Sequence, residues 1–263
     1  MDRKKASRRI KVSDGEHQKA LGGDFIPEDV HDYRIERPSF TIYLGGDPKV
    51  FPPDDYALDE PGVEHNMADR FEMNMSILSG IDPDRPILVK MSTCGGHWVE
   101  GMKMFGAILT CPNPVTVLAT KWARSMTSII PLAADRFLIR PPAQYMYHRG
   151  TYGFYGLDQE ADTEDVQRRK CYEMMLRIYV ARLKEQGKFS RWPEHKIRAM
   201  LEEGIRKDID VWLEADEAKH WGFADAVFDG NLRTLRAKHK NQPRRERMLA
   251  VLRKPIRVEV KVS

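Results

Sequence analysis

The strongest constraint on the fold is a nearly continuous apolar run at residues 86–91, which is soon followed by the glycine pair Gly95-Gly96. Such a run is typical of a parallel strand that is covered on both faces of its sheet. Apolar residues at helical spacing follow the glycines, and a second apolar run occupies residues 114–119. Strand, helix and strand at this separation predict a βαβ crossover and therefore an α/β architecture.

The same alternation of strands and helices continues on both sides of this unit. Further strands are expected at residues 40–44, 137–139, 144–147 and 208–213, and further helices at residues 64–79, 163–186, 193–204 and 215–221. The expected strand at residues 208–213 alternates polar and apolar side chains, which places Asp208 and Asp210 on the same side of it. Gly204 and Gly222 are expected to end the helices that precede them.

Composition limits the classes of protein to which the chain can belong. Its 263 residues, 41% of them hydrophobic, are enough for one substantial core. Nothing approaches 18 consecutive apolar residues, and the N-terminus is charged, so we expect no membrane span and a cytoplasmic location. Cys94, Cys111 and Cys171 lack the spacing of a disulfide framework or a zinc site, and no metal is expected.

The two ends of the chain differ from its middle. Residues 1–37 are charged and weakly patterned, whereas residues 231–263 carry 11 Lys/Arg against 2 Asp/Glu. We therefore expect a loosely ordered arm at 1–37, a folded domain at 38–230 and a basic tail at 231–263. A basic tail is able to contact nucleic acid, but no aromatic residue interleaves the basic ones, which favours a solvated, partly helical extension.

Three motifs supply the parts that acyl-transfer chemistry needs. Gly95-Gly96 stands between a strand and a helix, where free backbone N–H groups are able to bind an oxyanion. Ser125 opens an apolar helical segment, and a helix N-cap is the alternative role for this serine. His148 ends an apolar strand and is a candidate general base, with a structural histidine as the alternative. Together these motifs predict a serine hydrolase.

Several assignments stay open at this level. Ser128 is a second candidate hydroxyl, although we expect it to be packed or bonded to the backbone. His97 is a second candidate base, expected instead to flank the substrate cleft. The carboxylate that orients the imidazole is either Asp210 or Asp208, because both lie on the expected strand.

These motifs, taken in order, resemble those of ClpP, the proteolytic subunit of the Clp protease. The resemblance extends from about residue 40 to residue 230 and implies a ClpP/crotonase-like α/β fold of repeated ββα units with a helical handle. Four segments carry this resemblance. Residues 93–96 are similar to the Ser-Pro-Gly-Gly motif of that family, residues 123–126 to its Ala-Ala-Ser-Met motif, residues 146–148 to its Met-Ile-His motif, and residues 210–218 to its aspartate segment.

The resemblance implies a role for each site residue. Ser125 would be the nucleophile, His148 the general base and acid, and Asp210 the orienting carboxylate, while the N–H groups of Gly96 and Met126 would form the oxyanion hole. It also implies a serine endopeptidase that cleaves polypeptides without a cofactor or metal. A homo-oligomeric ring enclosing a chamber, and an AAA+ unfoldase that drives ATP-dependent proteolysis, are the expected partners.

The chain also departs from the family pattern. Cys94 replaces a proline, which makes the glycine loop less rigid, and Arg124 and Lys121 replace small residues, which predicts extra positive charge near the cleft. Residues 187–204 resemble an insertion in the handle. The polar N-terminal arm and the basic tail lie outside the resemblance. Such additions are similar to those of phage or prophage Clp-like peptidases, and this likeness would imply a role in processing head proteins. A crotonase-type acyl-CoA enzyme and a non-catalytic ring subunit are the alternative functions.

Overall fold

Two sheets form the centre of the molecule in the computed structural model, which describes residues 27–45, 62–153 and 156–258. The larger sheet has six strands in the order β1-β2-β3-β4-β6-β9, and all neighbours after the antiparallel β1–β2 pair are parallel. The smaller sheet has the order β5-β7-β8. The strands are β1 (Ile35–Glu36), β2 (Thr41–Gly45), β3 (Ile87–Ser92), β4 (Val115–Ala119), β5 (Trp122–Arg124), β6 (Arg136–Ile139), β7 (Gln144–His148), β8 (Asp210–Leu213) and β9 (Ala226–Val227).

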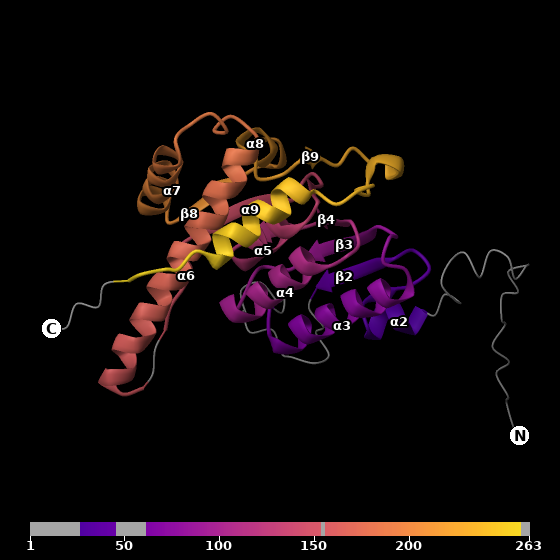
Figure 1. Cartoon of the computed structure of the whole chain (residues 1–263), viewed down its shortest axis with the longest axis horizontal. Coiled ribbons are helices and arrows are strands. Elements are labelled where there is room, and N and C mark those ends of the chain that lie inside the picture. The colour runs from indigo at the N-terminus through magenta and orange to yellow at the C-terminus, as the bar shows by residue number, and fades with distance from the viewer. Residues whose placement is uncertain (1–26, 46–61, 154–155, 259–263) are drawn as a thin grey trace, which may run out of the picture.

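Helices cover the sheets, and one of them extends well beyond the body of the molecule (Figure 1). The α-helices are α2 (Pro27–Asp32), α3 (His65–Ile81), α4 (Trp98–Thr110), α5 (Met126–Ile129), α6 (Asp158–Glu185), α7 (Glu194–Asp208), α8 (Ala215–Trp221) and α9 (Gln242–Arg253). Short 3₁₀ segments, η1 (Ile130–Ala133) and η2 (Leu232–Thr234), complete the set. Figure 1 shows α3 and α4 side by side, and the long α6 reaching away from them.

Strand β3 is buried on both faces, as its apolar run predicts. Ile87, Val89 and Met91 lie in the main core with residues of α3 and α4. Leu88 belongs instead to a separate apolar cluster with Leu118, Leu138 and Leu235. The prediction of a doubly covered parallel strand is therefore confirmed.

The segment before β8 differs from its expected structure. Helix α7 continues through Gly204 to Asp208, and Ile209, with φ of 64°, turns the chain into β8. The prediction that Asp208 and Asp210 share one strand is therefore wrong. Gly204 is needed inside the helix because a Cβ at this position would lie 2.9 Å from the hydroxyl of Tyr147. The glycine permits this close approach and does not end the helix.

Part of the expected N-terminal arm belongs to the sheet. Strand β1 lies within residues 1–37 and pairs with β2, with Ile35 opposite Ile42. Ile35 is buried in the main core, so this part of the arm is held by packing. Residues 1–26 of the expected arm lie outside the described residues.

Parts of the expected basic tail are packed against the domain. Leu235 covers the second face of the large sheet, and the guanidinium of the half-buried Arg236 donates to the carbonyl oxygens of Phe40 and Pro86 at 3.0 and 2.7 Å. Helix α9 lies along α6 (Figure 1), with Met248 fully buried. The expectation of a solvated extension is wrong for these residues, because their basic groups satisfy internal acceptors.

A buried ionic network fixes α9 to the body. The Arg244 side chain is 2% exposed, and it donates to Glu185 Oε1 at 2.7 Å and to Asp225 Oδ1 at 2.7 Å. Arg182, which is fully buried, also donates to Asp225, at 2.8 Å. Burial alone would raise the pKa of Asp225, but the charges of Arg182 and Arg244 outweigh it and hold that pKa well below its usual value.

We predict that Arg244→Met destabilises the protein by roughly 3–5 kcal/mol, because Asp225 and Glu185 then lose one of the two buried guanidinium groups that balance their charges, and only Arg182 remains. The free energy of unfolding in urea measures this loss. Arg253→Met, at an exposed position in the last turn of the same helix, is the control and is expected to cost less than about 1 kcal/mol. Equal losses in the two variants would contradict a specific role for the buried network.

Candidate active site

The small sheet brings three distant segments to one place. Strand β5 pairs in parallel with β7, with Arg124 opposite Met146, and the chain leaves β5 at Ser125. Strand β8 pairs with β7 in the antiparallel direction, with His148 opposite Asp210. Because β7 lies between the other two strands, these pairings place Ser125 and Asp210 on either side of His148.

The side chains of these three residues form one hydrogen-bonded chain. Ser125 Oγ lies 2.8 Å from His148 Nε2, and His148 Nδ1 lies 3.0 Å from Asp210 Oδ1. The His148 side chain is 17% exposed, which leaves an open path to the hydroxyl. Asp208, the alternative carboxylate, is the last residue of α7, and the structure brings Asp210 to the imidazole. A hydroxyl, a base and an orienting carboxylate in this order form the arrangement that activates a nucleophile.

The backbone at Ser125 is held in an uncommon conformation. Its φ is 52° and its ψ is −127°, a region that costs a non-glycine residue about 1–3 kcal/mol. The Ser125 side chain makes no helix-capping hydrogen bond, so it does not act as an N-cap, and its hydroxyl is directed to His148. Two backbone bonds hold the turn, from Ser125 N to Met146 O at 3.1 Å and from Ser128 N to Ser125 O at 3.0 Å.

The glycine pair lies directly beside this turn. A Cβ on Gly95 would lie 2.6 Å from Ser125 Cβ, and one on Gly96 would lie 2.3 Å from Val63 O. Both glycines also have positive φ, of 105° and 145°. Only glycine fits at these two positions, because any side chain would push the loop away from Ser125 or from Val63.

Two backbone N–H groups are available near the hydroxyl. Val63 N donates to Gly95 O, and His97 N donates to Val63 O at 2.9 Å, so the N–H of Gly96 lies on the side away from Val63. The N–H of Met126 is the first of α5, where N–H groups have no partner within the helix. Gly96, Met126, Ser125 and His148 line the same pocket, so these donors suit an oxyanion that forms at Ser125.

The family model for Clp protease matches residues 58–231 of this chain. The chain belongs to the Clp protease family. The ATP-dependent Clp protease proteolytic subunit 1 of Chlamydia abortus is 28% identical over 170 residues, which are 64% of this chain and 82% of the relative. The ATP-dependent Clp protease proteolytic subunit of Deinococcus radiodurans is 23% identical over 171 residues, which are 64% of this chain and 76% of the relative.

The solved structures also include a similar fold. The structure of the ClpP1 N165D mutant from Listeria monocytogenes aligns with a TM-score of 0.56 at 22% sequence identity, covering 79% of this chain and 98% of that chain. The resemblance to ClpP and the predicted α/β fold class are therefore confirmed.

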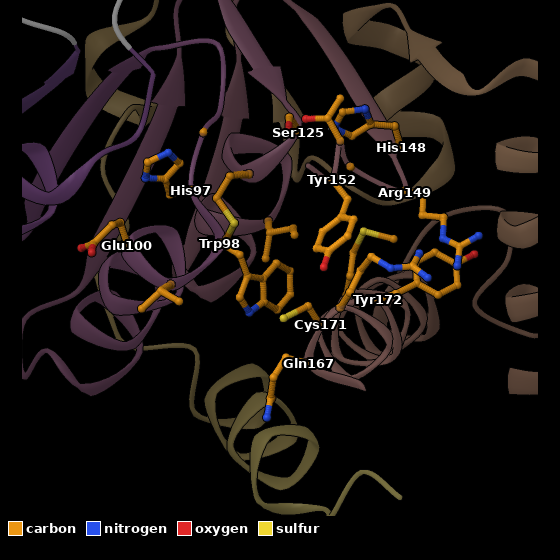
Figure 2. A pocket seen from close by; sticks show the side chains of 18 of the residues that line it. His97, Trp98, Glu100, Ser125, His148, Arg149, Tyr152, Gln167, Cys171 and Tyr172 are labelled. Carbon is orange, nitrogen blue, oxygen red and sulfur yellow. Dashed lines mark hydrogen bonds between the residues drawn. The ribbon is translucent and has the colours of Figure 1, made fainter. Parts of the chain in front are cut away.

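The Clp-family site opens into a pocket of about 750 Å³. Figure 2 shows Ser125 and His148 close together at one end of it, with Tyr152 between them and Trp98. The pocket is walled by α4, α5 and α6, and its apolar lining includes Trp98, Ile129 and Met175. His97 lines the pocket away from the Ser125 hydroxyl (Figure 2), where the sequence predicts that it flanks the cleft.

Reciprocal contacts hold the loop after His148 against α6. The guanidinium of Arg149 lies over the ring of Tyr172 at 5.0 Å, and that of Arg168 lies over the ring of Tyr152 at 5.5 Å. Each contact joins the loop to the helix, and all four residues line the pocket. These cation–π pairs stabilise one pocket wall.

Arg124 and Lys121, which were expected to place extra positive charge near the cleft, do not line the pocket itself. Arg124 Nε donates to Cys94 O at 3.1 Å, and its guanidinium lies over the ring of Trp122 at 4.8 Å. The ammonium of Lys121 lies over the same ring, at 5.6 Å. Arg124 therefore supports the glycine loop at the position where ClpP has a proline.

Two residues that support the site from within the fold were not predicted from the sequence. Thr127 is fully buried; its hydroxyl lies 3.0 Å from Thr93 O and 2.8 Å from Arg124 O, and it accepts from Arg124 N at 3.2 Å, which joins the glycine loop to the serine turn. Tyr179 contacts Ser128 at 2.6 Å. The only signal for these residues was a hydroxyl side chain in an otherwise apolar helical segment.

Two further observations concern cofactors and membranes. Within the described ranges, no cluster of three or more His, Cys, Asp and Glu side chains is arranged to hold a metal ion. None of the helices in the described part of the chain combines the length and the apolar character needed to cross a bilayer.

We predict that Gly95→Ala lowers the rate of Ser125 modification by a fluorophosphonate by about 10²-fold, because the new methyl group displaces the loop from the nucleophile. Labelling rates, with thermal melting as a check on folding, measure the effect. Gly106→Ala in α4 is the matched control, since a Cβ there meets nothing within 4 Å. It is expected to keep full labelling and to gain about 0.5–1 kcal/mol of stability; equal labelling of both variants would contradict the proposed packing.

Proposed function

We propose that this Clp-family chain is a serine endopeptidase with Ser125 as nucleophile, His148 as general base and acid, and Asp210 as orienting carboxylate. The continuous hydrogen-bonded chain from Ser125 Oγ through the imidazole to Asp210 is the observation that carries this proposal. The adjoining pocket, with the backbone amides of Gly96 and Met126 on its wall, supports it.

The geometry suggests how each group acts. Ser125 Oγ attacks the peptide carbonyl carbon while His148 Nε2 takes the hydroxyl proton, and the resulting oxyanion accepts hydrogen bonds from the N–H groups of Gly96 and Met126. His148 then gives this proton to the amide nitrogen as the C–N bond breaks. Water hydrolyses the acyl-enzyme, with His148 again as the base. Asp210 accepts a hydrogen bond from the Nδ1–H group and keeps the imidazole in the required tautomer.

The complete triad distinguishes this proposal from the two alternatives. A crotonase-type acyl-CoA enzyme would use the glycine-loop amides but would not need a serine and an imidazole in hydrogen-bond contact. A non-catalytic ring subunit would tolerate a broken triad, whereas all three side chains are in contact here. Both alternatives are therefore less consistent with the site.

We further propose that the chain cleaves polypeptides within a homo-oligomeric ring and is served by an AAA+ unfoldase, in the cytoplasm. Support comes from relatives that are named ATP-dependent Clp protease proteolytic subunits. The peptidase domain, predicted to span residues 38–230, would extend at least to residue 253, because α9 is fixed by buried ion pairs. The internal hydrogen bonds of the half-buried Arg236 and the buried Arg244 argue against nucleic-acid binding by these residues.

Replacement of the triad tests the catalytic part of the proposal. Ser125→Ala is expected to abolish fluorophosphonate labelling and peptide cleavage. Asp210→Asn is expected to lower kcat by about 10⁴-fold, because the imidazole loses its orienting acceptor. Asp208→Asn, an exposed neighbour at the end of α7, is the control and should leave kcat within about twofold. Labelling that persists in Ser125→Ala would reject Ser125 as the nucleophile.

Native mass spectrometry tests the proposed assembly. We expect species at multiples of the 30.4 kDa chain, with the inactive Ser125→Ala variant showing the same masses, since assembly does not require turnover. Peptidase activity should follow the oligomeric fractions in size-exclusion chromatography. A species of single-chain mass that retains full activity would contradict a chamber.

A further inference from the structure

A series of buried hydroxyl contacts links the backbone of Ser125 to helix α6. Ser128 Oγ lies 2.6 Å from the carbonyl oxygen of Ser125 and 2.6 Å from the hydroxyl of Tyr179. Ser128 is fully buried, and Tyr179 is 1% exposed. The hydroxyl of Tyr145 also donates to the carbonyl oxygen of Ser128, at 3.0 Å. None of these three supporting residues lines the pocket, so they reach the nucleophile only through its main chain.

The direction of these hydrogen bonds follows from counting protons. A carbonyl oxygen only accepts, so the single proton of the Ser128 hydroxyl is donated to Ser125 O. The contact between Ser128 and Tyr179 therefore requires the phenol to be the donor. Burial raises the pKa of Tyr179 well above its ordinary value, which keeps this proton in place. The order is thus Tyr179 to Ser128 to the carbonyl of Ser125.

The carbonyl of Ser125 belongs to the same peptide unit as the N–H of Met126. A trans peptide is planar, and its C=O and N–H point in opposite directions. Ser125 O accepts two hydrogen bonds from Ser128, one from its hydroxyl at 2.6 Å and one from the Ser128 backbone N–H at 3.0 Å. Fixing this oxygen fixes the direction of the Met126 N–H. The turn needs such support because Ser125 has a φ of 52°.

We propose that Tyr179 and Ser128 are positioning residues that hold the Ser125–Met126 peptide plane, and with it the Met126 N–H, in the orientation that stabilises the oxyanion. This inference rests on the proposed serine peptidase function. It gives α6 two roles at one site, because Cys171 and Met175 of the same helix line the pocket while Tyr179 supports the donor.

The expected kinetic signature is specific. The oxyanion forms only in the transition state, so a misdirected donor lowers kcat and leaves KM largely unchanged. A peptide aldehyde forms a hemiacetal whose oxygen occupies the same place, so its inhibition constant should rise by the same factor as kcat falls. Rates are expressed per active site, counted by titration with the fluorophosphonate, so misfolded molecules are not included. A folding defect alone would therefore not change kcat and the inhibition constant by the same factor.

Tyr179→Phe tests the proposal by removing one oxygen atom from a buried ring. We expect kcat for a fluorogenic peptide to fall about tenfold and KM to stay within about twofold. The loss in kcat is smaller than the 10²–10³-fold effect of deleting an oxyanion donor, because the donor is still present. Tyr147→Phe is the matched control, since the two rings are 5.8 Å apart in the same buried cluster. Among the described residues the Tyr147 hydroxyl has no hydrogen-bond partner, so its loss should leave kcat within about twofold.

A second variant separates the steps of the series. Ser128→Ala removes the bond to Ser125 O directly and is expected to lower kcat at least as much as Tyr179→Phe. Because Tyr179 acts through Ser128, the double variant should be no slower than Ser128→Ala alone. Independent, multiplying effects of the two substitutions would show that Tyr179 does not act through Ser128 and would overturn the proposed order.

The remaining outcomes are distinguishable. The inference is overturned if Tyr179→Phe keeps kcat and aldehyde affinity within twofold of the active wild type. It is also overturned if Tyr147→Phe loses as much activity as Tyr179→Phe, because packing of the aromatic cluster would then explain both losses. In either case the peptidase function itself stands. A folded wild type that neither cleaves peptides nor reacts with the fluorophosphonate would instead overturn the proposed function, and this inference with it.

Discussion

The pairing of β7 with both β5 and β8 is the constraint on which the site depends. A parallel neighbour on one side and an antiparallel neighbour on the other bring the end of β5 and the start of β8 to the end of β7. A shift of one residue in either register would turn the side chain of His148 or Asp210 to the opposite face. The buried faces of these strands, which include Ala123, Tyr145 and Val211, fix the register that the polar residues use.

This small sheet alone does not hold the serine turn. The strained backbone of Ser125 is supported by a hydroxyl series from α6 on one side and by the glycine loop on the other. Thr127 and Arg124 join that loop to the turn, and Arg124 contacts it at Cys94, where ClpP has a proline. Side-chain hydrogen bonds therefore restrain this loop at both ends of its contact with the turn.

Local patterns in the sequence predicted the parts of the fold that depend on local chemistry. The doubly buried β3, the glycine loop and the positions of Ser125 and His148 follow from apolar runs and from residues that end them. The strand β5 was not predicted, because three residues are too few to show an alternating pattern. Gly204 was wrongly predicted to end a helix, because a glycine is required there by the hydroxyl of Tyr147, which is distant in sequence. The choice between Asp208 and Asp210 depended on the turn at Ile209, which no local pattern showed.

The basic C-terminal segment was misread for a related reason, and its packing explains its charge. From the sequence alone, Arg244 was expected to be solvated. The fold places Asp225 and Glu185, which are separated from it in sequence, in contact with its guanidinium. Helix α6 carries Cys171, Met175, Tyr179 and Arg182 at helical spacing, so one face of it meets the pocket, the serine turn and the ionic network. The bond of Arg244 to Glu185 at the end of α6 therefore restrains the helix that both walls the pocket and contacts the serine turn.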